Sequence, residues 1–185
     1  SLDDCVCLPG HYKAFGNCIP CALSTYKDLP GNHACTPCPH ESVTDTRGAS
    51  SPSQCSCPPG FQREGDLCIP CGLGYFSAAV SDTCEACHAN SSTLLAKSTS
   101  QGKCMCLPGF WEQKPFLCSK CKEGFYCGFG DVPVACPSRM TSAEGSAKKQ
   151  DCVCDSGYVR WEVNGEISCE SCPRDYYCPG PDVEP

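Results

Sequence analysis

Thiols are the groups whose number and spacing could do chemistry in this chain. Cysteine accounts for 23 of its 185 residues, above the roughly 8–10% at which a chain is typical of a disulfide scaffold. Thiols at this density can form disulfides, bind zinc as thiolates, or leave one reactive thiolate as a nucleophile. Their spacing and the residues around them decide between these chemistries.

Zinc is the first alternative to weigh. Two C-x-x-C pairs separated by thirteen residues, and two more separated by twelve, have the spacing of a four-thiolate zinc site. In the third copy of this pattern Cys127 and Cys136 are eight residues apart, yet the copy still holds six cysteines. A metal site would not tolerate that shift, so we predict disulfides and no metal site. A zinc-dependent intracellular scaffold is the minor alternative. The two candidate sets are Cys18, Cys21, Cys35 and Cys38, and Cys68, Cys71, Cys84 and Cys87.

Catalysis by cysteine needs a free thiolate beside a base such as histidine. The chain has only four histidines, and every complete repeat can pair all of its cysteines. We therefore predict no catalytic residue and no cofactor, and we expect that the chain is not an enzyme.

The cysteines recur with a nearly fixed period. A C-x-C pair begins at residues 5, 55, 104 and 152, and a C-x-x-C pair closes each stretch at residues 18, 68, 118 and 169. A glycine follows each C-x-C pair after two intervening residues, which predicts a turn with positive φ or a close approach of two backbone segments. These glycines are Gly10, Gly60, Gly109 and Gly157.

Leu, Ile, Val and Phe together supply only 29 residues, below the roughly 20% that a chain needs to fold around an apolar core. The segments between cysteines are rich in Ser, Thr, Gly and Pro, and none keeps a helical apolar period. The sequence therefore predicts a small disulfide-rich fold: tandem modules of short β-hairpins and loops with almost no helix. Because each module should contact mainly its neighbours, we expect an elongated rod.

These repeats resemble two known families. The third repeat is similar to an EGF-like domain. Its Cys152-Val-Cys-Asp-Ser-Gly-Tyr segment, like Cys104-Met-Cys-Leu-Pro-Gly-Phe in the second repeat, resembles that family's C-x-C-x-x-G-[FY] ending. The first two resemble the cysteine-rich segment of ephrin receptors and the ephrin-receptor-like repeats of large protist surface proteins. The residues that carry this resemblance are Cys21-Ala-Leu-Ser-Thr-Tyr, Cys35-Thr-Pro-Cys and Cys55-Ser-Cys-Pro-Pro-Gly-Phe; Ala22-Leu23-Ser24 departs from the usual Pro-x-Gly.

The EGF-like resemblance implies a crossed disulfide order within each repeat: first to third, second to fourth and fifth to sixth. A sequential order, first to second and third to fourth, is the alternative; it would add Cys172–Cys178 and leave Cys5 alone. Under the crossed order Cys5, Cys172 and Cys178 pair with cysteines outside this sequence, and we expect a segment of a longer array. The crossed order predicts Cys7–Cys18, Cys21–Cys38, Cys35–Cys55, Cys57–Cys68, Cys71–Cys87, Cys84–Cys104, Cys106–Cys118, Cys121–Cys136, Cys127–Cys152 and Cys154–Cys169.

The cysteine count sets the predicted domain boundaries. We expect residues 1–20 to complete a preceding module and residues 172–185 to begin a following one. The three complete modules between them, called here the first, second and third repeat, are 21–70, 71–120 and 121–171. The resemblance implies EGF-like, ephrin-receptor-like modules for the first two repeats and an EGF-like module for the third.

We expect an extracellular or cell-surface protein of the secretory pathway, because disulfides persist in oxidising compartments. The predicted function is that of a disulfide-stabilised spacer or assembly segment in a larger surface or filament protein; a ligand-binding receptor or adhesin segment is the alternative. Its partners would be proteins, including copies of itself or other parts of the same long chain. The net charge of −7 argues against nucleic acid, no apolar run could span a membrane, and Asn90-Ser-Ser is a glycosylation sequon.

Overall fold

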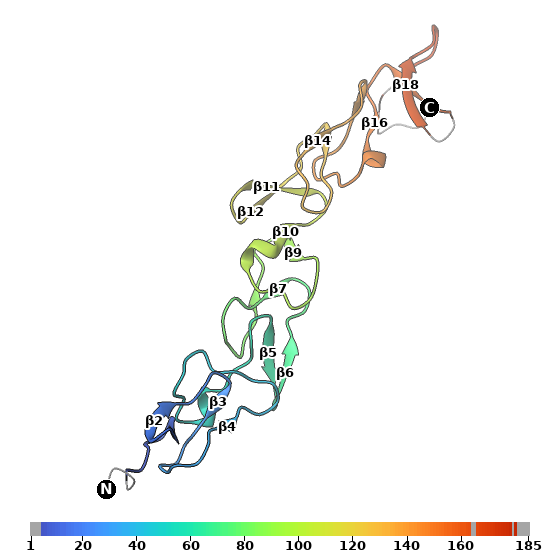
Figure 1. Ribbon diagram of the computed structural model, residues 1–185. Coiled ribbons are helices and arrows are strands. Elements are labelled where there is room, and N and C mark those ends of the chain that lie inside the picture. The colour runs from blue at the N-terminus through green and yellow to red at the C-terminus, as the bar shows by residue number, and fades with distance from the viewer. Residues whose placement is uncertain (1–4, 164–165, 179, 181–185) are drawn as a thin grey trace. The chain divides into compact units, whose positions relative to one another are not determined.

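The computed structural model describes residues 5–163, 166–178 and 180. Its strands form two-stranded antiparallel hairpins rather than a continuous sheet (Figure 1). Within the described residues, helix is limited to three short 3-10 turns, η2 (Pro52–Gln54), η3 (Gln101–Lys103) and η4 (Lys149–Asp151). The prediction of small disulfide-rich modules made of short hairpins and loops is therefore confirmed.

A longer hairpin recurs four times, and each copy ends one residue before the second cysteine of a closing C-x-x-C pair. Each begins after the repeated glycine, and its second strand carries the first cysteine of the closing pair. The four are β1 (His11–Ala14) with β2 (Asn17–Pro20), β5 (Phe61–Glu64) with β6 (Leu67–Pro70), β11 (Phe110–Lys114) with β12 (Leu117–Lys120), and β17 (Tyr158–Val163) with β18 (Glu166–Ser171).

Shorter pairs of strands follow each of the first three long hairpins. In the first kind of pair, one strand follows the first cysteine of the repeat and the other lies just before the second inner cysteine. In the second kind, the second strand overlaps the C-x-C motif. The first kind comprises β3 (Thr25–Tyr26) with β4 (Thr36–Pro37), β7 (Tyr75–Phe76) with β8 (Glu85–Ala86), and β13 (Phe125–Tyr126) with β14 (Val134–Ala135). The second kind comprises β9 (Ser91–Thr93) with β10 (Cys104–Cys106) and β15 (Met140–Thr141) with β16 (Val153–Cys154); in the first repeat a single bridge joins Val43 to Ser56.

The chain divides into two compact units. One is Ser1–Cys87 with Thr93–Lys103, and the other is His88–Ser92 with Cys104–Pro185. This division runs through the second predicted repeat, so it does not follow the module boundaries expected from the cysteine count.

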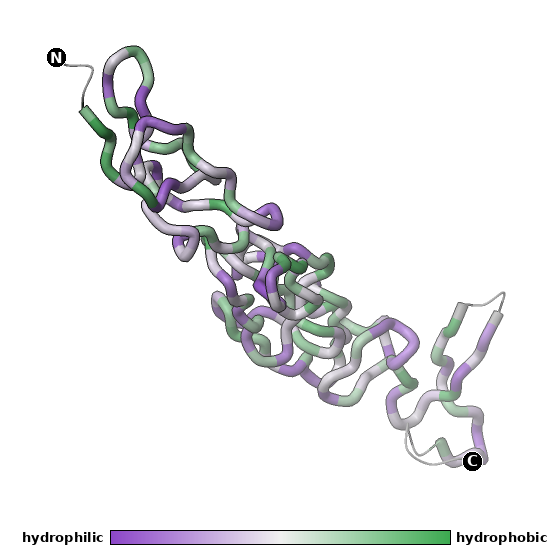
Figure 2. Tube along the Cα trace, turned by 90° about the horizontal axis from the view of Figure 1, so that it is seen from below, coloured by the Kyte–Doolittle hydropathy of each residue, from purple (hydrophilic) through white to green (hydrophobic). Residues whose placement is uncertain are grey.

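Disulfides take the place of an apolar core in both units. Cys21, Cys57, Cys71, Cys121 and Cys127 are each 0% exposed, whereas large apolar side chains lie at the surface throughout the chain. Hydrophobic and hydrophilic residues are intermixed along the trace, with no long hydrophobic run (Figure 2). Burial of sulfur thus does what burial of aliphatic side chains does in larger domains.

The glycines after the first three C-x-C pairs have both properties predicted for them, whereas Gly157 has a positive φ of 85° but no described atom within 4 Å of where a Cβ would lie. Gly10 and Gly109 have φ angles of 79° and 85°, in the left-handed region. A Cβ atom on Gly10 would lie 2.2 Å from the carbonyl oxygen of Gly48, and one on Gly109 would lie 2.3 Å from that of Gly145. Any side chain here would separate the turn from the loop packed on it.

Candidate functional site: the disulfide ladder and its polar junctions

The cysteines form a ladder of short-range bridges. Each of the bridges below joins neighbours in the cysteine order, so it closes a small loop and does not interleave with the next. Cys87 and Cys104 are disulfide-bonded as well, and Cys5 is free and exposed. The bridges are Cys7–Cys18, Cys21–Cys35, Cys38–Cys55, Cys57–Cys68, Cys71–Cys84, Cys106–Cys118, Cys121–Cys127, Cys136–Cys152, Cys154–Cys169 and Cys172–Cys178.

This ladder corrects the crossed order. The structure has the sequential alternative, including Cys172–Cys178, and four bridges are common to both orders: Cys7–Cys18, Cys57–Cys68, Cys106–Cys118 and Cys154–Cys169. The pairings that are wrong are Cys21–Cys38, Cys35–Cys55, Cys71–Cys87, Cys84–Cys104, Cys121–Cys136 and Cys127–Cys152.

The short gap inside the C-x-x-C pair explains the correction in the first and second repeats. Cys35 and Cys38 flank the two-residue strand β4, and successive side chains of an extended segment point to opposite faces. Residues three apart therefore face opposite ways: Cys35 faces back to Cys21, and Cys38 faces on to Cys55. The crossed order would require each of them to reach the other's side.

One bridge changes its span along the chain. The first cysteine of the first and second repeats bonds across 14 and 13 residues, to Cys35 and Cys84. The first cysteine of the third repeat, Cys121, bonds across only 6 residues to Cys127, and Cys172–Cys178 has the same separation. The sixth residue after the first cysteine is therefore a disulfide-bonded cysteine in the third repeat and in the segment after it, but a different residue in the first and second repeats.

In the first repeat that sixth residue is a buried lysine. Lys27 is 1% exposed, and its ammonium group donates hydrogen bonds to the carbonyl oxygens of His11, at 2.6 Å, and Gly31. Burying a charge is costly unless it is hydrogen-bonded, and two carbonyl dipoles supply that compensation here. In the second repeat Ser77 takes this place, is 2% exposed, and donates to the carbonyl of Ala79 at 3.1 Å.

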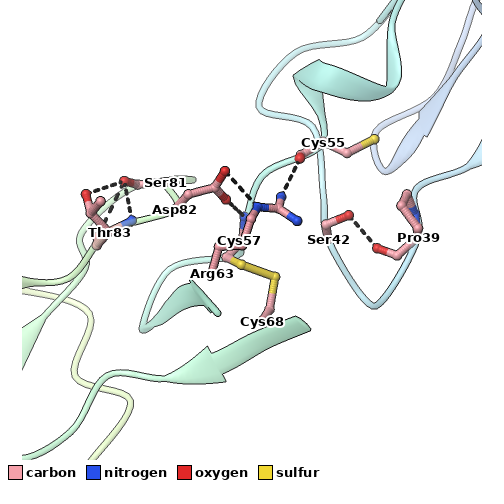
Figure 3. Close-up of polar contacts among 9 residues, drawn as sticks. All are labelled: Pro39, Ser42, Cys55, Cys57, Arg63, Cys68, Ser81, Asp82 and Thr83. Carbon is pink, nitrogen blue, oxygen red and sulfur yellow. Dashed lines mark hydrogen bonds and ion pairs between the residues drawn. A yellow bond between two sulfur atoms is a disulfide. The ribbon is translucent and has the colours of Figure 1, made fainter. Parts of the chain in front are cut away.

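An arginine joins the end of the first repeat to the second (Figure 3). Arg63 on β5 donates through Nη2 to the carbonyl oxygen of Cys55 at 2.7 Å, and its Nε lies 2.9 Å from Oδ2 of Asp82. The other carboxylate oxygen of Asp82 accepts the backbone N–H of Cys57 at 2.9 Å. One ion pair thus ties the backbone on both sides of Ser56 to the loop before β8 (Glu85–Ala86).

The pair shifts both ionisation equilibria in the direction that favours charge. The hydrogen bond from Arg63 lowers the pKa of the Asp82 carboxyl below its usual value; the Cys57 N–H and the positive charge of Arg63 add to this, and partial burial opposes it. The hydrogen bond with Asp82 likewise raises the pKa of Arg63. Because the side chains are 28% and 40% exposed, solvent screens part of this interaction.

Sequence reasoning missed this junction, although a spacing signal for it exists. Asp82 follows Cys57 by 25 residues, and Asn32 follows Cys7 by the same interval. In each case the side-chain oxygen accepts the backbone N–H of that cysteine, at 2.9 Å for Asp82 and 3.2 Å for Asn32. An acceptor recurring at this offset could have been read from the repeats; its ion-pair partner could not.

The cysteines considered as zinc ligands do not form a thiolate set. Cys18, Cys21 and Cys38 belong to three different disulfides, so their sulfurs are bonded elsewhere. Among the described residues, one group of histidine and cysteine atoms lies within 4.8 Å of one another, formed by His88, Cys106 and Cys118. Its two sulfurs are bonded to each other, which removes them as thiolate ligands in this state.

The sequon asparagine lies in an accessible turn. Asn90 is exposed, has a φ of 58°, and its carbonyl oxygen accepts the N–H of Leu107 at 2.9 Å just before β9. Its side chain is thus available to solvent, and its glycosylation stays a prediction. None of the helices in the described part of the chain has the length and apolar content that crossing a membrane requires.

Comparison with known proteins places the repeats. A family model described as tyrosine-protein kinase ephrin type A/B receptor-like matches residues 10–55. Cysteine repeat modular proteins A and B of Toxoplasma gondii are 36% and 33% identical over 88% and 94% of this chain, which spans only 6% and 3% of their lengths. Human ephrin type-B receptor 4 is 44% identical over 48 residues, 25% of this chain and 5% of the receptor.

These matches agree with the C-x-C period, the glycine turns and the bridged hairpins, each of which recurs along the sequence. The chain is a cysteine-rich repeat array, and its residues 10–55 match the ephrin-receptor-like family model.

Proposed function

We propose that this chain is a disulfide-stabilised spacer or assembly segment of a larger extracellular or surface protein, acting through protein–protein contacts. The observation that carries the proposal is the ladder itself, which supplies a fold almost without an apolar core. Such a fold suits an oxidising compartment, and its disulfides resist unfolding although the chain has few apolar residues. The names of the two Toxoplasma relatives, cysteine repeat modular proteins A and B, fit a repeated structural segment better than an enzyme.

The distribution of apolar surface supports a spacer over a specific binder. Exposed large apolar residues are spread from Val6 to Tyr177 rather than confined to one element. A receptor or adhesin segment would be expected to gather them into one patch of several hundred Å². The ephrin receptors among the relatives keep the ligand-binding alternative in view, but they match a quarter of this chain or less.

The module boundaries belong to the same proposal. Every bridge given above closes within 1–20, 21–70, 71–120, 121–171 or 172–185, so these segments are proposed as the units of repetition. The elongated rod and the glycan on Asn90 are proposed with them. Small-angle scattering of the oxidised protein tests the rod, and a mass shift removed by an asparagine-glycan amidase tests the glycan.

The function is tested by capture from extracellular fluid and cell surfaces with the oxidised protein as bait. A spacer or assembly segment is expected to recover copies of itself or of its parent protein, and a reduced and alkylated bait should recover neither. Reproducible, saturable capture of one unrelated surface protein by the oxidised bait would overturn the spacer and establish the adhesin.

A further inference from the structure

One disulfide of the array has a histidine against it. Nε2 of His88 lies 3.2 Å from Sγ of Cys118, the partner of Cys106. The three residues belong to the same compact unit. A disulfide sulfur carries no hydrogen, so the hydrogen in this contact must be on Nε2, with sulfur as a weak acceptor.

The other ring nitrogen has no competing role. Nδ1 of His88 is buried and has no hydrogen-bond partner among the described residues. Imidazole usually fixes its tautomer through a second hydrogen bond, and here the contact with sulfur is the polar interaction that orients the ring. The ring of Phe116, at the tip of the β11–β12 hairpin, packs edge-on against the His88 ring, with the ring centroids 6.1 Å apart.

The other repeats lack this arrangement. His88 directly follows the second inner cysteine, and the residues in the same place are Pro39 in the first repeat and Pro137 in the third. Proline has no side-chain hydrogen-bond donor. The disulfides equivalent to Cys106–Cys118, which are Cys7–Cys18, Cys57–Cys68 and Cys154–Cys169, therefore form an internal reference set.

We propose that Cys106–Cys118 is a thiol-exchange site, at which a small thiol or a protein thiol forms a mixed disulfide with Cys106 and His88 assists the departure of Cys118. Exchange runs fastest when the leaving sulfur is the more stabilised as a thiolate. A hydrogen-bond donor 3.2 Å from Cys118 provides that stabilisation to one sulfur of the pair and so selects which one leaves.

The step balances without an added oxidant. The thiolate of the incoming thiol attacks Sγ of Cys106 and forms a new S–S bond, while the Cys106–Cys118 bond breaks. Its electron pair stays on Sγ of Cys118, which accepts the hydrogen bond from Nε2 of His88 and then a proton from solvent. One disulfide replaces another, and the released Cys118 thiol is free to be alkylated.

Access to the sulfurs is the step that precedes chemistry. Cys106 and Cys118 are 3% and 8% exposed, whereas Phe116 is 47% exposed at a hairpin tip with a φ of 62°. The charged residue opposite Cys118 in the strand register is Glu112, whose carboxylate accepts the N–H of Phe116 at 2.9 Å and holds the tip closed. Opening of this tip would expose the bridge.

The test treats the oxidised chain with reduced glutathione, quenches by alkylation, and maps each disulfide by mass spectrometry. The glutathione adduct is expected on Cys106 and the alkyl group on Cys118. His88→Leu should slow opening of this bridge about tenfold, the size of effect expected from one hydrogen bond to a charged atom, and His88→Gln, which keeps a donor, should restore part of the rate. Opening of Cys57–Cys68 should not change.

Phe116→Ala separates cover from chemistry. It should speed opening of Cys106–Cys118 both with His88 present and in combination with His88→Leu, while the ratio between these two opening rates persists. An adduct found mainly on Cys118, or equal rates for wild type and His88→Leu in both backgrounds, would overturn the proposal. A folding defect is recognised by a simultaneous change at Cys154–Cys169, which lies in the same compact unit as His88, and the opening rates are then compared between wild type and His88→Gln.

Discussion

The first and third repeats differ in the buried residue that lies six positions after their first cysteine. Each begins with a buried cysteine followed six residues later by a second buried side chain: Lys27 after Cys21, and Cys127 after Cys121. In the first repeat that side chain is satisfied by backbone carbonyls and the bridge goes to Cys35; in the third the side chain is itself the bridge. In both repeats this position is buried and its side chain is hydrogen-bonded or disulfide-bonded. The position of the disulfide partner, in contrast, differs between the repeats.

Moving the bridge changes how much of the loop is constrained. In the chain-entropy model a bridge closing about 15 residues stabilises by roughly 3 kcal/mol and one closing about 7 by roughly 2.4 kcal/mol. The third repeat therefore leaves its loop before Cys136 held by hydrogen bonds, such as that from the N–H of Cys136 to the carbonyl of Gly124 at 2.9 Å. The comparison predicts a stiffer loop in the first repeat.

Removing the movable bridge should have the largest effect. The double substitution Cys21→Ala with Cys35→Ala is expected to lower the free energy of local unfolding by about 3 kcal/mol, and Cys121→Ala with Cys127→Ala by about 2.4 kcal/mol, because the shorter loop loses less entropy on closure. Native-state hydrogen exchange of the amides in each repeat measures both values. An equal or larger loss in the third repeat would break the comparison.

The buried side chain comes next. Lys27→Ala removes the donor to the carbonyls of His11 and Gly31 and should lower the free energy of local unfolding by about 2 kcal/mol. The matched control, Ser77→Ala, removes one hydrogen bond and should cost about 1 kcal/mol. Hydrogen exchange in the two repeats gives the pair of values, and a larger loss for the serine would mean that the ammonium group is not compensated as described.

The Arg63 junction should be worth less, because solvent reaches it. Arg63→Ala is expected to lower the free energy of local unfolding around Cys55 and Cys57 by about 1 kcal/mol. The control is Arg160→Ala, whose ion pair with Glu162 joins side chains that are 56% and 58% exposed; its loss should stay within about 0.5 kcal/mol. Equal effects at the two arginines would show that the bond to the Cys55 carbonyl adds nothing.

The same comparison shows what the sequence could predict. Period, glycine turns and hairpins follow from the spacing of cysteine and glycine, because those residue types have few alternative uses. Pairing did not follow, because Cys35 and Cys38 are close in sequence and only the extended strand between them shows that they face apart. Lys27 and Arg63 escaped prediction for a related reason: a charged residue in a polar loop has no sequence signal that tells a buried, carbonyl-bound side chain from a solvated one.

The smallest effect concerns protonation of Asp82. Its pKa is lowered in the folded chain, chiefly by the hydrogen bond from Arg63, so its stabilising contribution is complete above the unfolded pKa of about 3.9 and is lost as the pH falls through the lower folded value. Local stability around Cys57 should therefore decline below about pH 4.

Asp82→Asn tests this by giving the second repeat the residue type that the first has at Asn32. The amide oxygen can still accept the Cys57 N–H, as that of Asn32 accepts the Cys7 N–H at 3.2 Å, but it cannot titrate. The variant should be less stable than wild type near about pH 6, and this difference should shrink below about pH 4 in hydrogen exchange or acid-unfolding measurements. A difference that stays constant across this pH range would show that Asp82 acts as a hydrogen-bond acceptor and that its charge contributes nothing. The acceptors Asp82 and Asn32 would then play the same role in the two repeats.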